Sequence, residues 1–230
     1  MPATPSNPPR AMVFDAYGTL LDVHAAMARH AARLGSNWQR LSAEWRSKQI
    51  EYTWVRSLAG PAHHRDFATL TDLALDHVAA RHGIADQGLL GDLRAAYRTL
   101  AAYPEVPAVL AALRGAGIPC AVLSNGSPAM LADAVRAAGL EGLLDAVLSV
   151  ESVGVFKPDP RVYRLAEDRL GHPATAMGFV SSNAWDAFGA RAAGFRVVWV
   201  NRSGQPDEYG LRGAVEELAD LSGLPALLRP

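Results

Sequence analysis

The sequence predicts an α/β fold, in which a parallel sheet flanked by helices carries an all-helical cap inserted after the first strand. A short apolar strand, residues 11–14, runs into Asp15 and a loop of turn-forming residues. Residues 23–99 show helical signals only, whereas strand and helix signals alternate from residue 100 onward. Because such alternation is typical of parallel sheets with right-handed crossovers, the helical run is predicted to be an insertion.

The length of the chain fits this organisation, since 230 residues are enough for one substantial core and a smaller lid. Residues 1–10 are rich in proline and lack an apolar stretch, so we predict a disordered N-terminal tail there. The α/β core domain is predicted over residues 11–22 and 100–230. The helical cap domain is predicted over residues 23–99.

Composition and charge restrict the function classes. The formal net charge is −1, so the whole-chain field favours neither nucleic acid nor a membrane as a partner. No segment approaches the ~20 apolar residues of a membrane span, and the tail does not resemble a signal peptide, so we expect a cytoplasmic protein. The single cysteine, Cys120, lies in an apolar run, which predicts a buried and unreactive thiol.

The elements after residue 100 have clear start and stop signals. Strands are predicted at four apolar runs, residues 118–123, 146–150, 177–180 and 196–200. The helices between them begin at proline or at capping side chains: Pro107, Ser127 with Pro128, Asp159 with Pro160, and Ser182 or Asn183. Glycines end the same helices: Gly115 with Gly117, Gly139, Gly171 and Gly194. This order predicts a Rossmann-like core.

Polar residues follow the predicted strands at the points where they end. They are Asp15, Ser124 with Asn125, Lys157, and the cluster Ser181, Asn183 and Asp186. In open parallel sheets, ligands bind at the carboxyl ends of the strands. We therefore expect these four segments to meet at one edge of the sheet. Asp at a strand end is by itself more typical of a simple loop cap.

Taken in order and spacing, five segments carry a family resemblance. They read FDAYGTLLDV, WRSKQIEYTW, LSNGSP, VFKPDPRVY and SSNAWDA, starting at residues 14, 45, 123, 155 and 181. The set resembles the haloacid dehalogenase superfamily, and within it the (S)-2-haloacid dehalogenase (type II) subfamily. The resemblance covers nearly the whole chain after the tail. It implies an enzyme, a hydrolase acting on carbon–halide bonds, with no cofactor.

The resemblance implies that Asp15 attacks the carbon that carries the halogen and forms an aspartyl ester, which water then hydrolyses. Thr19 would hold the Asp15 carboxylate, and Lys157 would orient it and supply positive charge. Asp186 would pair with Lys157 and is a candidate for polarising the water, although the residue that takes the proton stays open. The catalytic set is completed by Ser181, Asn183 and Arg46. Asn183 could equally be only a helix cap.

Substrate contacts are implied in the same way. Arg46 would reach from the cap and receive the halide together with Asn125 and Trp185, because guanidinium and amide N–H groups suit an anion. Ser124 would bind the substrate carboxylate with backbone N–H groups after Asp15. The remaining predicted substrate-binding residues are Ala16, Tyr17, Ile50, Phe67 and Tyr163. Ile50 falls on the same helix face as Arg46.

Tyr17 separates the subfamilies. Phosphatases of this superfamily usually carry a second Asp two residues after the nucleophile, where this chain has a phenol, and Ser181 with Ser182 stands where an acidic residue is expected. Because magnesium usually takes more than one carboxylate, Asp15 and Asp186 alone would make a poor metal site, so we predict none. A halide leaving group needs no proton, so the missing acid matters little.

The predicted reaction is hydrolysis of short (S)-2-haloalkanoic acids to (R)-2-hydroxyalkanoic acids and halide. Two alternatives stay open: a small-molecule phosphatase of the same superfamily, and a catalytically inactive binding protein of this fold. The predicted partners are the haloacid and halide only, with neither nucleic acid nor membrane, in a possible homodimer. His63 and His64 are adjacent in a loop and are predicted to be exposed.

Overall fold

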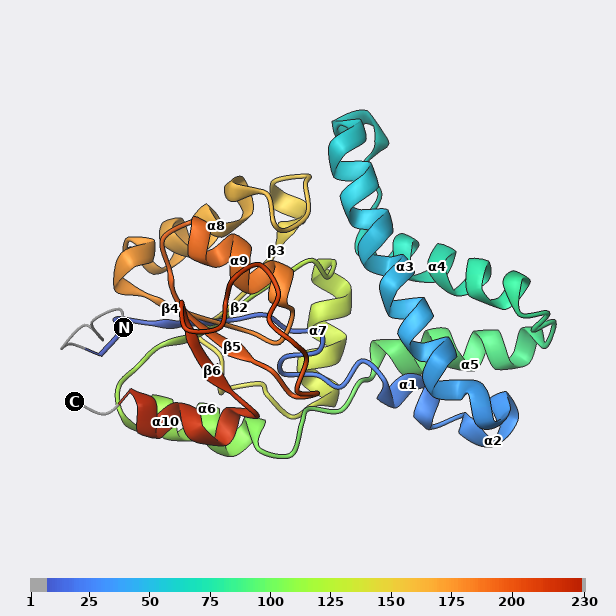
Figure 1. The fold of residues 1–230 in the computed structure, drawn as a ribbon, viewed down its shortest axis with the longest axis horizontal. Coiled ribbons are helices and arrows are strands. Elements are labelled where there is room, and N and C mark those ends of the chain that lie inside the picture. Colours follow the sequence, from blue (N-terminus) through green and yellow to red (C-terminus); the bar gives the residue numbers. More distant parts are fainter. Residues whose placement is uncertain (1–7, 229–230) are drawn as a thin grey trace.

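The apolar run that precedes Asp15 forms the central strand of the sheet. In the computed structural model, which describes residues 8–228, this strand is β1, Met12–Phe14, and all three of its side chains are fully buried. The other strands are β2 (Cys120–Ser124), β3 (Ala146–Ser149), β4 (Gly178–Ser181), β5 (Arg196–Val200) and β6 (Glu216–Leu218). The six strands are parallel throughout, in the order β3-β2-β1-β4-β5-β6 (Figure 1).

Helices occupy both faces of the sheet and a separate region beside it. The helices after residue 100 are α6 (Val106–Gly115), α7 (Pro128–Ala137), α8 (Pro160–Leu170), α9 (Ala184–Ala192) and α10 (Leu224–Leu227). The pair α6 and α10 covers one face, and the pair α8 and α9 covers the other (Figure 1). Short 3₁₀ turns lie at Gly35–Asn37, Pro61–His63, Val150–Ser152, Ala174–Ala176 and Leu221–Gly223. The predicted fold class is confirmed.

The run predicted to be all-helical contains five helices. They are α1 (Ala25–Ala28), α2 (Ala31–Leu34), α3 (Trp38–Ala59), α4 (Phe67–Arg81) and α5 (Gln87–Arg98). They stand to one side of the sheet, and the long helix α3 packs against α4 (Figure 1). Below, residues 25–98 are called the helical segment.

Two linkers join the helical segment to the sheet, and they run side by side. Leu21 and Ala102 form an antiparallel bridge, the N–H of Asp22 donates to the carbonyl of Ala101 at 3.0 Å, and the N–H of Tyr103 donates to the carbonyl of Leu20 at 3.0 Å. We propose that the domain limits predicted near residues 22 and 100 lie in these linkers.

Capping chemistry sets several helix ends as the sequence indicates. The Ser127 side chain accepts a hydrogen bond from the N–H of Met130, and the Asp159 side chain accepts one from the N–H of Arg161. Gly171 follows α8 with φ +69°, a left-handed conformation that glycine adopts without strain. Local signals therefore suffice at these helix ends.

The structure differs from the prediction near both ends of the chain. Of the predicted N-terminal tail, residues 1–7 fall outside the described residues. The N–H of Arg10 donates to the carbonyl of Ala176 at 2.8 Å, so the last residue of that stretch is bonded to the core. At the other end, β6 and α10 were not predicted. Strand β6 reads Glu-Glu-Leu and is largely exposed, so it has no apolar run to reveal it.

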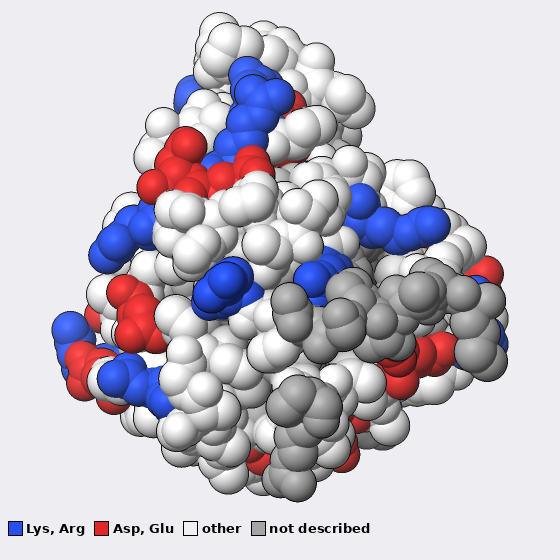
Figure 2. Space-filling model, turned by 90° about the vertical axis from the view of Figure 1, so that its left-hand side faces the viewer, with Lys and Arg blue, Asp and Glu red and all other residues white. Residues whose placement is uncertain are grey.

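The surface carries charges of both signs. On the face nearest the chain termini, basic and acidic side chains alternate with large uncharged areas (Figure 2). The described part of this face therefore has no extended field of one sign, in line with the net charge of −1. Among the described helices, none is long and apolar enough to cross a membrane.

Candidate active site

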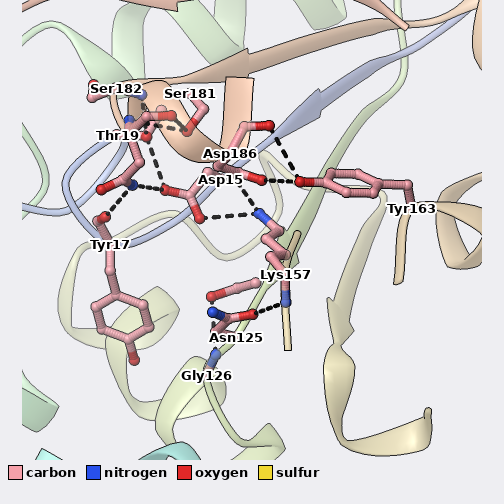
Figure 3. A network of polar contacts seen from close by, with 12 residues as sticks. Asp15, Tyr17, Thr19, Asn125, Gly126, Lys157, Tyr163, Ser181, Ser182 and Asp186 are labelled. Carbon is pink, nitrogen blue, oxygen red and sulfur yellow. Dashed lines mark hydrogen bonds and ion pairs between the residues drawn. The ribbon is translucent and has the colours of Figure 1, made fainter. Parts of the chain in front are cut away.

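The Asp15 carboxylate lies at the carboxyl end of β1, where three donors hold it (Figure 3). Its Oδ1 accepts from Lys157 Nζ at 3.2 Å. Its Oδ2 accepts from Thr19 Oγ1 at 3.0 Å and from Asn183 Nδ2 at 2.8 Å. Because the donors bind both oxygens from different directions, they fix the orientation of the carboxylate.

The loop after Asp15 folds into a tight turn that brings Thr19 back to it. The carbonyl of Ala16 accepts from the N–H groups of Thr19, Leu20 and Leu21. Gly18 lies within this turn at φ +93°, a conformation that a residue with a Cβ rarely adopts. The turn therefore requires glycine at position 18. We call residues 15–21 the nucleophile loop.

Lys157 lies between two carboxylates in a fully buried position. Its ammonium contacts Asp15 Oδ1 at 3.2 Å and Asp186 Oδ2 at 2.9 Å, and it lies 5.0 Å from the centre of the Phe179 ring. Burial alone would lower the pKa of Lys157, but attraction from Asp15 and Asp186 outweighs it and leaves that pKa raised. The lysine therefore remains a cation at neutral pH.

Asp186 stands in the first turn of α9 and is fully buried. Burial raises its pKa, while the Lys157 ammonium and the Tyr163 hydroxyl act in the opposite direction. Tyr163 donates from α8 to Asp186 Oδ1 at 2.8 Å (Figure 3). Burial also raises the pKa of Tyr163, so its hydroxyl stays protonated and remains a donor. A carboxylate more basic than an exposed aspartate is well suited to accept a proton from water.

Replacing Tyr163 by phenylalanine is expected to shift the acid limb of the kcat profile to higher pH. The hydroxyl stabilises the ionised form of Asp186, so its loss raises the pKa of Asp186 further. A base with a higher pKa becomes protonated, and so inactive, at a higher pH. We would measure kcat from about pH 4 to 8 in both proteins. An unshifted limb would show that Asp186 does not govern it.

The end of β4 supports the nucleophile loop through Ser181, the last residue of the strand, and through Ser182 and Asn183, which follow it. The N–H of Ser182 donates to Thr19 Oγ1 at 2.9 Å, so the Thr19 hydroxyl is held on both sides. Ser181 Oγ accepts from the N–H of Asn183 at 3.1 Å, which makes a local turn. Asn183 stands at the N-cap position of α9, but its side chain makes no capping bond and contacts Asp15 and Tyr17 instead.

Arg46 extends from α3 of the helical segment to this edge of the sheet. Its Nη2 donates to the carbonyl of Tyr17 at 3.1 Å and to Asn183 Oδ1 at 3.4 Å. Its Nη1 is buried and has no hydrogen-bond partner among the described residues. A buried donor without an acceptor is unfavourable by about 1–3 kcal/mol, which an anionic ligand would offset. The predicted neighbours Ile50 and Phe67 are also buried.

A cluster of aromatic side chains packs where the helical segment meets the sheet. The Tyr17 ring lies against Tyr97 and Phe67, with ring centres 5.6 Å apart in both pairs. Its side chain extends away from Asp15, whereas its carbonyl faces the site (Figure 3). Trp185 is half-buried and meets Trp54 edge to face at 5.6 Å. Trp54 was not predicted, because tryptophan in a helix is more often a core residue.

Three predicted substrate-binding residues make other contacts. Ser124 Oγ accepts from the N–H of Gly126 at 3.1 Å, and Asn125 Oδ1 accepts from the N–H of Lys157 at 3.0 Å. The Asn125 contact leaves its amide nitrogen as the donor for a ligand. Tyr163 is buried and bonds to Asp186, which makes it a positioning residue for Asp186 in this structure. Ala16 is buried in the turn.

The expectation that both loop histidines are exposed is wrong for His64. His63 is exposed, but His64 is half-buried, and its Nε2 lies 2.8 Å from Glu151 Oε2. Its ring also stacks on Phe156, with ring centres 4.9 Å apart. His64 thus connects the helical segment to the residue before Lys157. Nothing in the local sequence marks this pair, because 87 residues separate its members.

The donor set of the site does not suit a divalent ion. Both carboxylates of the site, Asp15 and Asp186, are engaged by the Lys157 ammonium, which holds the position between them. Within residues 8–228, no cluster of three or more His, Cys, Asp and Glu side chains could hold a metal ion. Cys120 is buried away from this edge in β2, and burial raises the pKa of its thiol to about 12.

Comparisons with known proteins place these residues in context. A haloacid dehalogenase-like hydrolase family model matches residues 9–194. The chain is 46% identical to (S)-2-haloacid dehalogenase 1 of Pseudomonas sp. (strain CBS-3), covering 96% of this chain and 97% of the relative. It is similar to the crystal structure of a dehalogenase with an intermediate complex, with a TM-score of 0.93, 43% identity and coverage of 97% and 99%. The structure of L-2-haloacid dehalogenase from Xanthobacter autotrophicus with chloropropionic acid covalently bound has a TM-score of 0.83, 35% identity and coverage of 96% and 98%.

Proposed function

Because the chain belongs to the haloacid dehalogenase-like hydrolase family, we propose that it is a 2-haloacid dehalogenase, a hydrolase acting on carbon–halide bonds. It converts short (S)-2-haloalkanoic acids to (R)-2-hydroxyalkanoic acids and halide. The observation that carries this proposal is the Asp15 carboxylate, held by Lys157, Thr19 and Asn183 from separate segments. Displacement at a saturated carbon requires the attacking oxygen to lie in line with the bond that breaks, and a carboxylate fixed in this way can be held in that line.

In the first step, an oxygen of Asp15 attacks C2 of the substrate from the side opposite the halogen. The new carbon–oxygen bond forms as the carbon–halogen bond breaks, and the halide leaves with the electron pair. This displacement inverts C2 and leaves an ester on Asp15. Lys157 keeps the carboxylate oriented until it attacks.

In the second step, water attacks the ester carbonyl carbon, Cγ of Asp15, and the bond between Cγ and the substrate oxygen breaks. The hydroxy acid leaves with the Asp15 oxygen that attacked it, and the water oxygen remains in Asp15. Asp186 accepts one proton of the water, since burial raises its pKa, and the departing alkoxide takes up a proton to become the 2-hydroxyl group. The other proton of the water passes to solvent as Asp15 returns to its carboxylate form. Lys157 lies 2.9 Å from Asp186 and 3.2 Å from Asp15, so it stabilises negative charge at both carboxylates.

The anionic groups of substrate and product are bound by neutral donors and one guanidinium. Arg46 receives the halide through Nη1, which has no partner among the described residues, and Asn125 and Trp185 share in binding it. Ser124 and the backbone N–H groups after Asp15 bind the substrate carboxylate. The reaction needs no metal ion, because Lys157 supplies the cation and a halide leaves without a proton. The predicted homodimer and cytoplasmic location stay predictions.

A single turnover in heavy-oxygen water tests this proposal. With enzyme in excess over (S)-2-chloropropionate, and with a chelator present, we expect the label in the Asp15 side chain and unlabelled oxygen in the 2-hydroxy acid. The reason is that water opens the ester at Cγ rather than at C2. Mass spectrometry of the Asp15 peptide and of the product measures both.

The control is an identical sample without substrate, in which Asp15 should stay unlabelled. Label in the first product with none in Asp15 would mean that water attacks C2 directly. Release of phosphate from phosphate esters that needs magnesium, without halide release from the haloacid, would replace the proposal with a phosphatase of the same superfamily.

A further inference from the structure

Arg202 is an arginine just after β5 that joins three segments distant in the sequence. Its Nη2 donates to the carbonyl of Thr19 at 2.9 Å, and its Nη1 contacts Glu105 Oε1 at 2.7 Å. Its guanidinium lies over the Tyr103 ring, 3.7 Å from the ring centre. The side chains of Arg202 and Glu105 are each only 17% exposed, so these contacts are largely shielded from solvent.

These contacts lie where the nucleophile loop meets the two linkers. Thr19 belongs to the nucleophile loop, and the Leu20 carbonyl that follows it accepts from the N–H of Tyr103 at 3.0 Å. Tyr103 and Glu105 belong to the linker that returns from the helical segment. One guanidinium therefore holds the loop and the returning linker together.

The contact with Thr19 has a direct consequence for Asp15. The side chain of Thr19 donates to Asp15 Oδ2 at 3.0 Å and accepts from the N–H of Ser182 at 2.9 Å. The peptide that joins Thr19 to Leu20 is held on one side by the N–H of Leu20, which donates to the carbonyl of Ala16 at 2.9 Å. The bond from Arg202 to the carbonyl holds the other side of the same peptide, so it restrains the backbone from which the Thr19 hydroxyl reaches Asp15.

We propose that Arg202 is a positioning residue that holds the Asp15 carboxylate in line for attack by acting through Thr19. The inference deepens the proposed function and rests on it. A planar guanidinium is suited to this role, since it can donate through separate nitrogens while its face stacks on an aromatic ring. Lysine carries a single point charge on a flexible stem and lacks the planar fork, so we expect it to replace these contacts only in part.

The test is a double-mutant cycle on single-turnover halide release. In the wild-type background, Arg202→Gln is expected to lower the rate of the carbon–halogen step about tenfold and to change KM less than about twofold. In the Thr19→Val background, which has no hydroxyl to direct, Arg202→Gln is expected to lower the rate by less than about twofold. Arg202→Lys keeps a cation beside Glu105, so it is expected to fold and still to lose the rate about fivefold.

Arg212→Gln is the matched control, because Arg212 also lies in the C-terminal part of the chain and pairs with Glu217 at 3.1 Å. It is expected to react at the rate of the natural chain. The inference would be overturned if Arg202→Gln lowered the rate equally in both backgrounds, or if it raised KM without lowering the rate. It would also be overturned if Arg202→Lys and Arg202→Gln both reacted at the rate of the unmutated protein. A natural chain that releases no halide from any 2-haloacid would overturn the proposed function, and this inference with it.

Discussion

Replacing Asp15 by asparagine is expected to abolish turnover, lowering kcat by at least about 10⁴-fold, while the chain still folds. An amide oxygen is a far weaker nucleophile than a carboxylate, and the proposed mechanism has no other group on the path to the ester. Neither Lys157 nor Asp186 can take its place, because both side chains are fully buried, whereas that of Asp15 keeps some exposure. Halide release from (S)-2-chloropropionate measures the loss.

The same variant should be moderately less stable. Both oxygens of Asp15 accept hydrogen bonds in the natural chain, so an amide places one NH₂ group against a donor. An unmade buried hydrogen bond is unfavourable by about 1–3 kcal/mol, which urea unfolding would detect. Asp22→Asn is the matched control, since Asp22 caps the N–H of His24 and should leave turnover unchanged. Turnover retained by Asp15→Asn would contradict the nucleophile assignment.

The sequence predicts the sheet well, because its punctuation is local. Proline and capping residues begin helices α6, α7 and α8 within a residue or so of the predicted points, and apolar runs mark β1 to β5. The meeting of Asp15, Lys157 and Asp186 also follows from a general rule, since parallel strands end at one edge. These parts of the fold and the site need only short-range signals and that rule.

Other features depend on contacts between distant parts of the chain. Strand β6 forms because β5 offers it hydrogen bonds, from Val198 to Val200, rather than because its own residues are apolar. Arg202 reaches Thr19 across 183 positions, and nothing near it in the sequence distinguishes it from a surface arginine. The two candidate roles of Asn183 could be separated only by the direction of its side chain.

Replacing Lys157 by methionine is expected to lower both the stability of the protein and its kcat. The side chains have similar length, but the variant leaves Asp15 and Asp186 together in a buried site without their cation. Removing one partner of a buried ion pair destabilises a protein by about 3–5 kcal/mol, and we expect a loss of that size at pH 7. We also expect kcat to fall at least about 10³-fold, because Asp15 loses the donor that orients it.

The loss of stability should depend on pH in a definite direction. Burial raises the pKa of Asp186, and Lys157 is the strongest influence that lowers it, so the variant raises that pKa further. A group whose pKa is higher in the folded chain than in the unfolded chain binds protons on folding, so its effect on stability becomes less favourable as the pH rises. The raised pKa of Lys157 itself makes its contribution constant up to alkaline pH, because that contribution is lost only as the pH rises through that pKa. The difference between the two proteins should therefore be smaller at pH 5 than at pH 8.

Lys48→Met is the matched control, since Lys48 pairs with Glu51 at the surface of α3 and should change stability by less than about 0.5 kcal/mol. Urea unfolding of both variants at pH 5 and pH 8 makes the comparison. A Lys157→Met chain whose deficit is the same at both pH values would show that its carboxylates take up no proton. The ammonium would then not be what allows two carboxylates to lie together at this edge, and the account of the site would lose its central contact.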